Sequence, residues 1–179
     1  MKKNSITIKE FVNRSIGEWK SIRSTHTLAF EEFENTYSSL SVSYLNLEDK
    51  EVNNILNSFN NKYIPSFALK ISWKARTEWE PENELSDNQS ILIFAPNSDN
   101  RGIIMKNKGY AELILSYSEY WIDEVNNLNI LSEYNATISE EKIWFLSDNV
   151  RTRYSVVKNK QHNSVIQTSH ATEIKQIST

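Results

Sequence analysis

Two segments of this chain repeat hydrophobic residues at the three- and four-residue intervals that predict an amphipathic helix. The first runs from Thr7 to Ile16, where Thr7 and Glu10 have the spacing of a capping box, and Gly17 ends it. The second runs from Asp49 to Phe59 and begins with an acidic residue, as the helix dipole favours. The residues expected on the buried faces are Ile8, Phe11, Val12 and Ser15 in the first helix, and Val52, Ile55, Leu56 and Phe59 in the second.

Most of the remaining chain alternates hydrophobic and polar residues with the period of two that is typical of β-strands. The clearest case is Phe67 to Glu80, where Trp73 and Trp79 fall on the same side. Polar turns rich in Asn, Asp, Ser and Lys separate the segments. The expected strands are Trp19 to Phe30, Tyr37 to Leu47, Phe67 to Glu80, Ser90 to Ala95, Gly102 to Lys106, Tyr110 to Tyr117, Glu119 to Ile122, Leu128 to Thr137, Glu140 to Val157 as a hairpin, and Ser164 to Ile177.

About ten short strands joined as a meander predict a mostly β fold, an antiparallel closed barrel with an N-terminal helix and one further short helix. We expect one domain over residues 1–179. The N-terminal helix either closes one end of the barrel or packs outside it. A barrel of this size has an interior just large enough for one small ligand, so polar residues that face inward are informative.

The hairpin from Glu140 to Val157 carries ions where a barrel core would carry Val or Leu. Glu141 shares a strand face with Phe145, and Arg151 shares a face with Arg153, because side chains alternate with period two. If these faces point inward, the ions line a polar cavity suited to an anion. If they point outward, they form a solvated sheet surface, and the pattern alone leaves both interpretations open.

Composition excludes several classes of function. The formal net charge of −3 gives no broad attraction to nucleic acid. The chain has no cysteine, which excludes disulfides, thiolate metal sites and covalent catalysis through a thiol of its own. No long apolar run predicts membrane insertion, and no signal core follows the first lysines, so we expect a cytoplasmic protein. The scattered histidines, His26, His162 and His170, have no metal-ligand spacing.

Besides the first predicted helix, six segments stand out when they are taken in order: SIGEWKSIRSTHTLAF from Ser15, ISWKARTEW from Ile71, NKGYAE from Asn107, LNILSEY from Leu128, EEKIWFLSDNVRTRYSVVK from Glu140 and ATEI from Ala171. Together they resemble the S-type phycobiliprotein lyases, the chromophore lyases that serve phycocyanin and phycoerythrin. The resemblance extends from about Phe11 to Ile174, and the ordered set is more specific than any one segment.

The resemblance implies a calycin barrel, like lipocalins and fatty-acid-binding proteins, that holds an open-chain tetrapyrrole (a bilin). It also implies an enzyme that attaches the bilin by a thioether to a cysteine of an apo-phycobiliprotein subunit. The alternative is a non-enzymatic barrel that carries a bilin, a fatty acid or another apolar anion. A third class, a structural linker of the phycobilisome, is disfavoured by the placement of the ions.

The resemblance also suggests roles for single residues. Arginine forks match carboxylates, and a carboxylate can accept hydrogen bonds from pyrrole N–H groups or move a proton. Tryptophans supply a stacking surface for a flat conjugated ligand, although the pattern alone favours barrel core for Trp73 and Trp79. The predicted propionate-binding residues are Arg151 and Arg153 with support from Arg23, the predicted catalytic carboxylates are Glu141 and Glu173, and the predicted stacking residues are Trp73, Trp79 and Trp144.

The expected ligand is phycoerythrobilin bound as substrate, with neither metal nor prosthetic group, and the expected target is a phycoerythrin subunit. The Asn- and Lys-rich composition suggests a marine picocyanobacterium or one of its phages, where this bilin is common. Further expected partners are a bilin reductase that donates the pigment and a second copy of the chain. No nucleic acid or membrane partner is expected.

Overall fold

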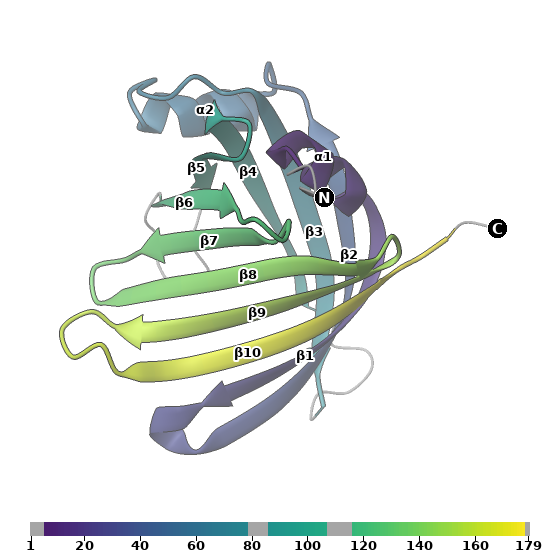
Figure 1. The fold of residues 1–179 in the computed structure, drawn as a ribbon, viewed down its shortest axis with the longest axis vertical. Coiled ribbons are helices and arrows are strands. Elements are labelled where there is room, and N and C mark those ends of the chain that lie inside the picture. The colour runs from purple at the N-terminus through teal and green to yellow at the C-terminus, as the bar shows by residue number, and fades with distance from the viewer. Residues whose placement is uncertain (1–5, 79–85, 107–115, 178–179) are drawn as a thin grey trace.

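In the part of the chain that the structure describes, residues 6–78, 86–106 and 116–177 of a computed structural model, ten antiparallel strands form one closed barrel. Each strand pairs with the next along the chain, and β10 pairs with β1 to close the ring (Figure 1). The predicted fold class is therefore confirmed. In chain order the strands are β1 (Gly17–Thr27), β2 (Glu32–Leu45), β3 (Phe67–Thr77), β4 (Ser86–Ser98), β5 (Arg101–Lys106), β6 (Ser116–Ile122), β7 (Leu128–Glu133), β8 (Thr137–Ser147), β9 (Val150–Asn159) and β10 (Val165–Lys175).

Helix α1 (Ile8–Ser15) closes one end of the barrel (Figure 1). Thr7 is its N-cap, and Thr7 and Glu10 exchange the two hydrogen bonds of the predicted capping box. Phe11 contacts Phe145 of β8 edge to face, with 5.1 Å between ring centroids. The sequence left open whether this helix closes one end of the barrel or packs outside it, and in the structure it closes the end.

The inner core of the barrel lies next to α1. Trp19 of β1 is almost fully buried there, and its indole N–H donates to the carbonyl of Ser15 over 2.9 Å. Gly17 joins α1 to β1 with a φ of 127°, a conformation that favours glycine. The buried residues of this core are Ile8, Phe11, Val12, Trp19, Val42, Phe67, Leu69, Phe94, Ile104, Tyr120, Ile122, Leu128 and Ile143.

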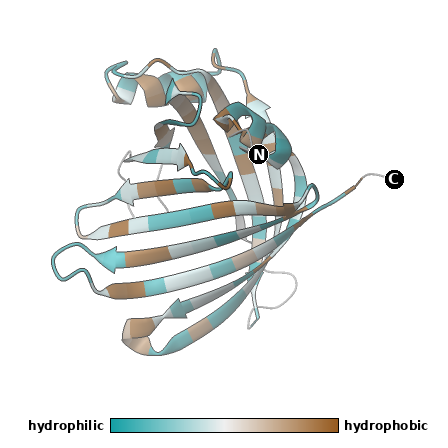
Figure 2. Ribbon diagram, in the orientation of Figure 1, coloured by the Kyte–Doolittle hydropathy of each residue, from teal (hydrophilic) through white to brown (hydrophobic). Residues whose placement is uncertain are grey.

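A second hydrophobic core lies outside the barrel, under helix α2 (Lys50–Ser58). Parts of β3, β4 and β5 are therefore apolar on both faces, whereas the middle of β8 is hydrophilic (Figure 2). Among the described residues, no helix has the length and apolar character needed to cross a membrane. The buried residues of this outer core are Val52, Ile55, Ala68, Ile91, Ile93, Ala95, Ile103 and Met105.

The first hairpin differs from the predicted boundaries. A short 3-10 helix, η1 (Leu28–Phe30), follows β1, and β2 already begins at Glu32 instead of Tyr37. Glu32 pairs with Thr27 and Glu34 with Thr25 in the ladder between the two strands. Residues of low strand propensity extend the sheet here because closing the ladder satisfies their backbone groups.

The predicted break between Tyr117 and Glu119 is wrong. Strand β6 continues through Ser118, whose buried hydroxyl lies 2.6 Å from that of Ser132 on β7. This hydrogen bond satisfies a polar group inside the barrel, so a serine does not interrupt the strand. The predicted strand from Tyr110 falls mostly outside the described residues.

Candidate functional site

The inner surface of the barrel changes character along its axis. Next to α1 it is apolar, around Trp19 and Phe145. Farther along the same strands it carries ions from β1, β8, β9 and β10, and beyond these it is rich in hydroxyls, such as the pair Ser155 and Ser169, whose oxygens are 3.1 Å apart. The ions of the hairpin therefore lie on the inner face, which decides between the two interpretations that the sequence left open.

Arg151 and Glu173 form a buried ion pair between β9 and β10. The two residues are register partners, and the Arg151 Nε donates to Glu173 Oε2. Arg151 is only 4% exposed and Glu173 is fully buried. The guanidinium also lies 4.3 Å from the ring centroid of Trp19. Arg151 is therefore already bound within the protein, at the boundary between the apolar and ionic parts of the interior.

Arg153 is held much more loosely than Arg151. Its Nη1 is 3.6 Å from Oε1 of Glu141, and its Nε is 3.9 Å from Oε1 of Glu173. Both distances exceed that of a hydrogen bond. Within the described residues, the buried atoms Arg153 Nε and Glu173 Oε1 have no hydrogen-bond partner. An unsatisfied buried polar atom costs free energy, so a polar ligand that forms hydrogen bonds with these two atoms gains binding free energy there.

The charges of this cluster support one another. Burial by itself raises the pKa of the Glu173 carboxyl, but Arg153, Arg151 and Arg23 together lower it below its usual value. Burial lowers the pKa of the Arg153 guanidinium, and the carboxylates of Glu141 and Glu173 reverse this and raise it. The Glu173 carboxyl and the Arg153 guanidinium are therefore both ionised at neutral pH. Arg23 contributes from the inner face of β1.

The structure separates the predicted tryptophans. Trp73 lies on the inner face of β3, half-buried and opposite Leu40 of β2, so it stays a candidate for stacking. Trp144 lies on the outer face of β8, because its neighbour Phe145 faces the inner core. The expectation that Trp144 lines the interior is therefore wrong. Trp79 falls outside the described residues.

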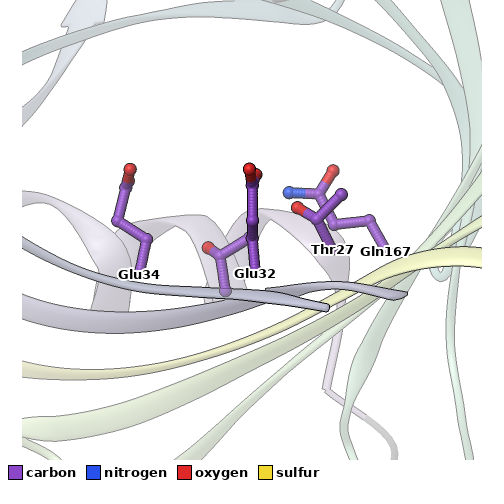
Figure 3. Close-up of a pocket in the computed structure, with 5 residues that line it drawn as sticks. Thr27, Glu32, Glu34 and Gln167 are labelled. Carbon is purple, nitrogen blue, oxygen red and sulfur yellow. The ribbon is translucent and has the colours of Figure 1, made fainter. Parts of the chain in front are cut away.

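The end of the barrel opposite α1 has an acidic hollow of about 140 Å³. Figure 3 shows Thr27, Glu32, Glu34 and Gln167 projecting from the same side of the sheet. Alternation places Glu32 and Glu34 on the inner face, as it does Arg23. We call this end, with Glu32 and Glu34, the acidic mouth of the barrel, and it lies outside the cluster of arginines and carboxylates. The hollow is lined by Thr25, Thr27, Glu32, Glu34 and Gln167.

Sequence reasoning missed Lys106, the last residue of β5, which faces the interior. Lys106 is two residues from Ile104, a fully buried member of the inner core. Lys106 and Ile104 have the two-residue spacing of one strand face. Ile103 and Met105 on the other face are hydrophobic as well, because that face packs in the outer core under α2. Without an alternating pattern, nothing identified the inner face of this strand.

The histidines have ordinary structural surroundings. His26 contacts Phe33 edge to face at 4.9 Å, and an imidazole nitrogen of His170 lies 2.8 Å from the Thr152 hydroxyl. Among the described residues, no three side chains of His, Asp or Glu are grouped as a metal site would require.

Comparison with known proteins places this geometry in context. The family model described as "CpeS-like protein" matches residues 7–176. Chromophore lyase CpcS/CpeS 3 of Trichodesmium erythraeum is 37% identical over 174 residues, which cover 94% of this chain and 98% of that protein.

Two further similarities are informative. The phycocyanobilin lyase subunit CpcS of Picosynechococcus is 28% identical, and the match covers 84% of this chain and 77% of that protein. The solved structure of the S-type phycobiliprotein lyase CPES from Guillardia theta superposes with a TM-score of 0.82 at 25% identity, covering 97% of this chain and 95% of that one.

Proposed function

Since this chain belongs to the CpeS-like family, we propose that it is a chromophore lyase that holds an open-chain tetrapyrrole in its barrel without a covalent bond. The lyase attaches that bilin by a thioether to a cysteine of an apo-phycobiliprotein subunit. The observation that carries the proposal is the buried ionic layer, in which Arg153 Nε and Glu173 Oε1 have no hydrogen-bond partner among the described residues.

A bilin complements the polar groups and the apolar wall of this interior. It is flat and mostly apolar, with two propionates and a row of pyrrole N–H groups. Arg153 offers a guanidinium fork to a propionate, and Arg23 adds positive charge from the neighbouring wall. The carboxylates of Glu141 and Glu173 accept hydrogen bonds from pyrrole N–H groups, and Trp73 provides an apolar face for stacking.

The reaction adds a thiol across a carbon–carbon double bond. The thiolate of the target cysteine forms a C–S bond to the exocyclic carbon of the ethylidene group, the π bond breaks, and a proton joins the adjacent ring carbon. No oxidant or reductant is needed. This chain has no cysteine, so the nucleophile belongs to the subunit. The lyase orients the bilin, and Glu141 is our candidate for moving the proton.

The finer assignment is phycoerythrobilin as substrate and a phycoerythrin subunit as target. It rests on composition, since relatives named for different bilins are equally similar: the putative phycoerythrobilin lyase CpeS of Microchaete diplosiphon is also 28% identical. We further propose that a bilin reductase delivers the pigment in the cytoplasm and that the lyase acts there as a homodimer.

The decisive experiment is co-expression of this chain with bilin-synthesis enzymes and single apo-subunits, followed by mapping of the modified cysteine. We expect one subunit cysteine to carry the bilin as a thioether. Purified lyase should bind about one bilin per barrel and release all of it on acid denaturation. Pigment that remains covalently attached to this chain would contradict the proposal.

The same experiment tests the alternative of a carrier. A carrier shifts and sharpens the bilin spectrum but leaves the subunit unmodified, whereas the lyase gives a covalent adduct. Apo-subunit with free bilin and no lyase is the control for spontaneous addition.

A further inference from the structure

Lys106 lies on a different wall of the barrel from the ion cluster and faces it. Strand β5 is four positions from β9 in the closed ring of ten strands, so the two lie on nearly opposite walls. Lys106 pairs with Leu92 of β4 and Ser116 of β6, on the inner side with Ile104. Its side chain is half-buried, and the alternation along β5 directs it toward the interior.

The electrostatics of Lys106 show that it belongs to the same charged interior. Burial lowers the pKa of its ammonium, Glu141 opposes this effect, and Arg153 adds to it. No described carboxylate forms a direct ion pair with this amine. The lysines Lys142, Lys158 and Lys160, by contrast, lie 3.2, 2.6 and 2.8 Å from their carboxylate partners. Lys106 is thus a partly desolvated cation without a close counter-ion in the described part of the chain.

Among the described groups of the ionic layer, cations outnumber carboxylates. The described groups that interact there are four cations, Arg23, Lys106, Arg151 and Arg153, and two carboxylates, Glu141 and Glu173. A ligand with two carboxylates needs a cation for each of them, and Arg153 and Lys106 stand on two different walls of this interior. Arg151 is closely paired with Glu173, whereas among the described residues Arg153 and Lys106 have no carboxylate oxygen within hydrogen-bond distance.

We propose that Lys106 is the second carboxylate-binding residue of the site and that it makes the barrel selective for dicarboxylates. The inference rests on the proposed function, because a bilin is the dicarboxylate considered. Arg153 binds one propionate from the β9 wall, and Lys106 binds the other from the β5 wall. With the two carboxylates held from two walls, the tetrapyrrole lies across the interior in one orientation, as selective attachment requires.

The test compares two forms of one ligand, phycoerythrobilin as the free diacid and as its dimethyl ester. We expect Lys106→Gln to weaken binding of the diacid about tenfold or more, the scale of one charge-assisted hydrogen bond. The same substitution should leave the affinity for the ester within about twofold, since no charge is there to be bound. Lys106→Arg should restore most of the preference for the diacid.

Lys20→Gln is the matched control. This substitution removes the same charge, but Lys20 is exposed on the outer face of β1. It should change neither affinity. Lys106→Met serves as a second uncharged variant if Lys106→Gln does not fold. If the affinities for diacid and ester fall equally, or if the affinity for the diacid does not change, the role of Lys106 is overturned and the proposed function is not affected. A wild-type protein that binds neither form would overturn the proposed function and this inference with it.

Discussion

The buried pair of Arg151 and Glu173 gives the sharpest prediction about stability. Removing one partner leaves the other as a desolvated charge, which costs about 3–5 kcal/mol. We expect Glu173→Leu to be the more damaging change, because it leaves Arg151 and Arg153 together with Glu141 as the one carboxylate near them among the described residues. Arg151→Met should cost less, because Arg153 and Arg23 still neutralise Glu173.

The double variant separates the pair from its surroundings. Arg151→Met combined with Glu173→Leu removes both charges and keeps side-chain volume, and such replacements of buried pairs are often neutral or stabilising. We therefore expect its free energy of unfolding to lie within about 1.5 kcal/mol of the wild type. The single variants are then strongly non-additive, with a coupling energy of at least about 2 kcal/mol.

Urea unfolding followed by circular dichroism and by tryptophan fluorescence measures these values, with coincident transitions as the test of two-state behaviour. A loss of 3–5 kcal/mol corresponds to a fall in Tm of roughly 6–20 °C for a chain of this length. If the two single effects simply add up in the double variant, the pair is not electrostatically coupled and our account of the interior is wrong.

Four further outcomes are expected. Arg153→Met should weaken bilin binding by about 1.5–3 kcal/mol with little change in stability, whereas the outer-face variant Arg101→Met should bind normally; equal affinities in an absorbance titration would contradict this. Glu141→Gln should still load bilin but transfer it about 10² to 10⁴ times more slowly in an initial-rate assay if this carboxylate moves the proton; transfer at the wild-type rate would make it structural. Burial opposes ionisation of Asp123, but hydrogen bonds from Asn127, Lys142 and Asn129 lower its pKa to about 2, so the stability it adds is present above about pH 4 and is lost as the pH falls toward 2; Asp123→Asn should flatten this acid limb in unfolding curves. Gly102→Ala should lower the free energy of unfolding by about 1–3 kcal/mol, because its methyl group would lie 2.5 Å from the Ala95 carbonyl oxygen; an unchanged urea midpoint would count against this packing.

The elements that follow from local chemistry were predictable from the sequence. The capping box of Thr7 and Glu10 depends only on residues three apart in sequence, and it forms as predicted. Alternation placed Arg151 and Arg153 on one face, and the structure has them so. A closed barrel followed from the number and spacing of the strands.

The side-chain pairings that depend on the register between two strands were not predictable. The contact of Arg151 with Glu173 joins residues 22 apart in sequence across the β9–β10 ladder, which contains an irregularity near Val165. The sequence therefore treats Arg151 and Arg153 alike, whereas the structure gives one a partner and leaves the other loosely held. The resemblance predicts Trp144 as a stacking residue, but its neighbours Ile143 and Phe145 occupy the inner face, which leaves Trp144 on the outer one.

Closure of one end of the barrel by α1 has a consequence for the kinetics of ligand exchange. A dianion that enters from the opposite end passes Glu32 and Glu34 before it reaches the arginines. Repulsion at the mouth slows its association, while attraction farther inside slows its release. Salt weakens both effects, because the screening length is about 8 Å at physiological ionic strength. Moderate salt should therefore speed up loading even as it lowers the equilibrium affinity, and ester forms of the same ligand should show neither response.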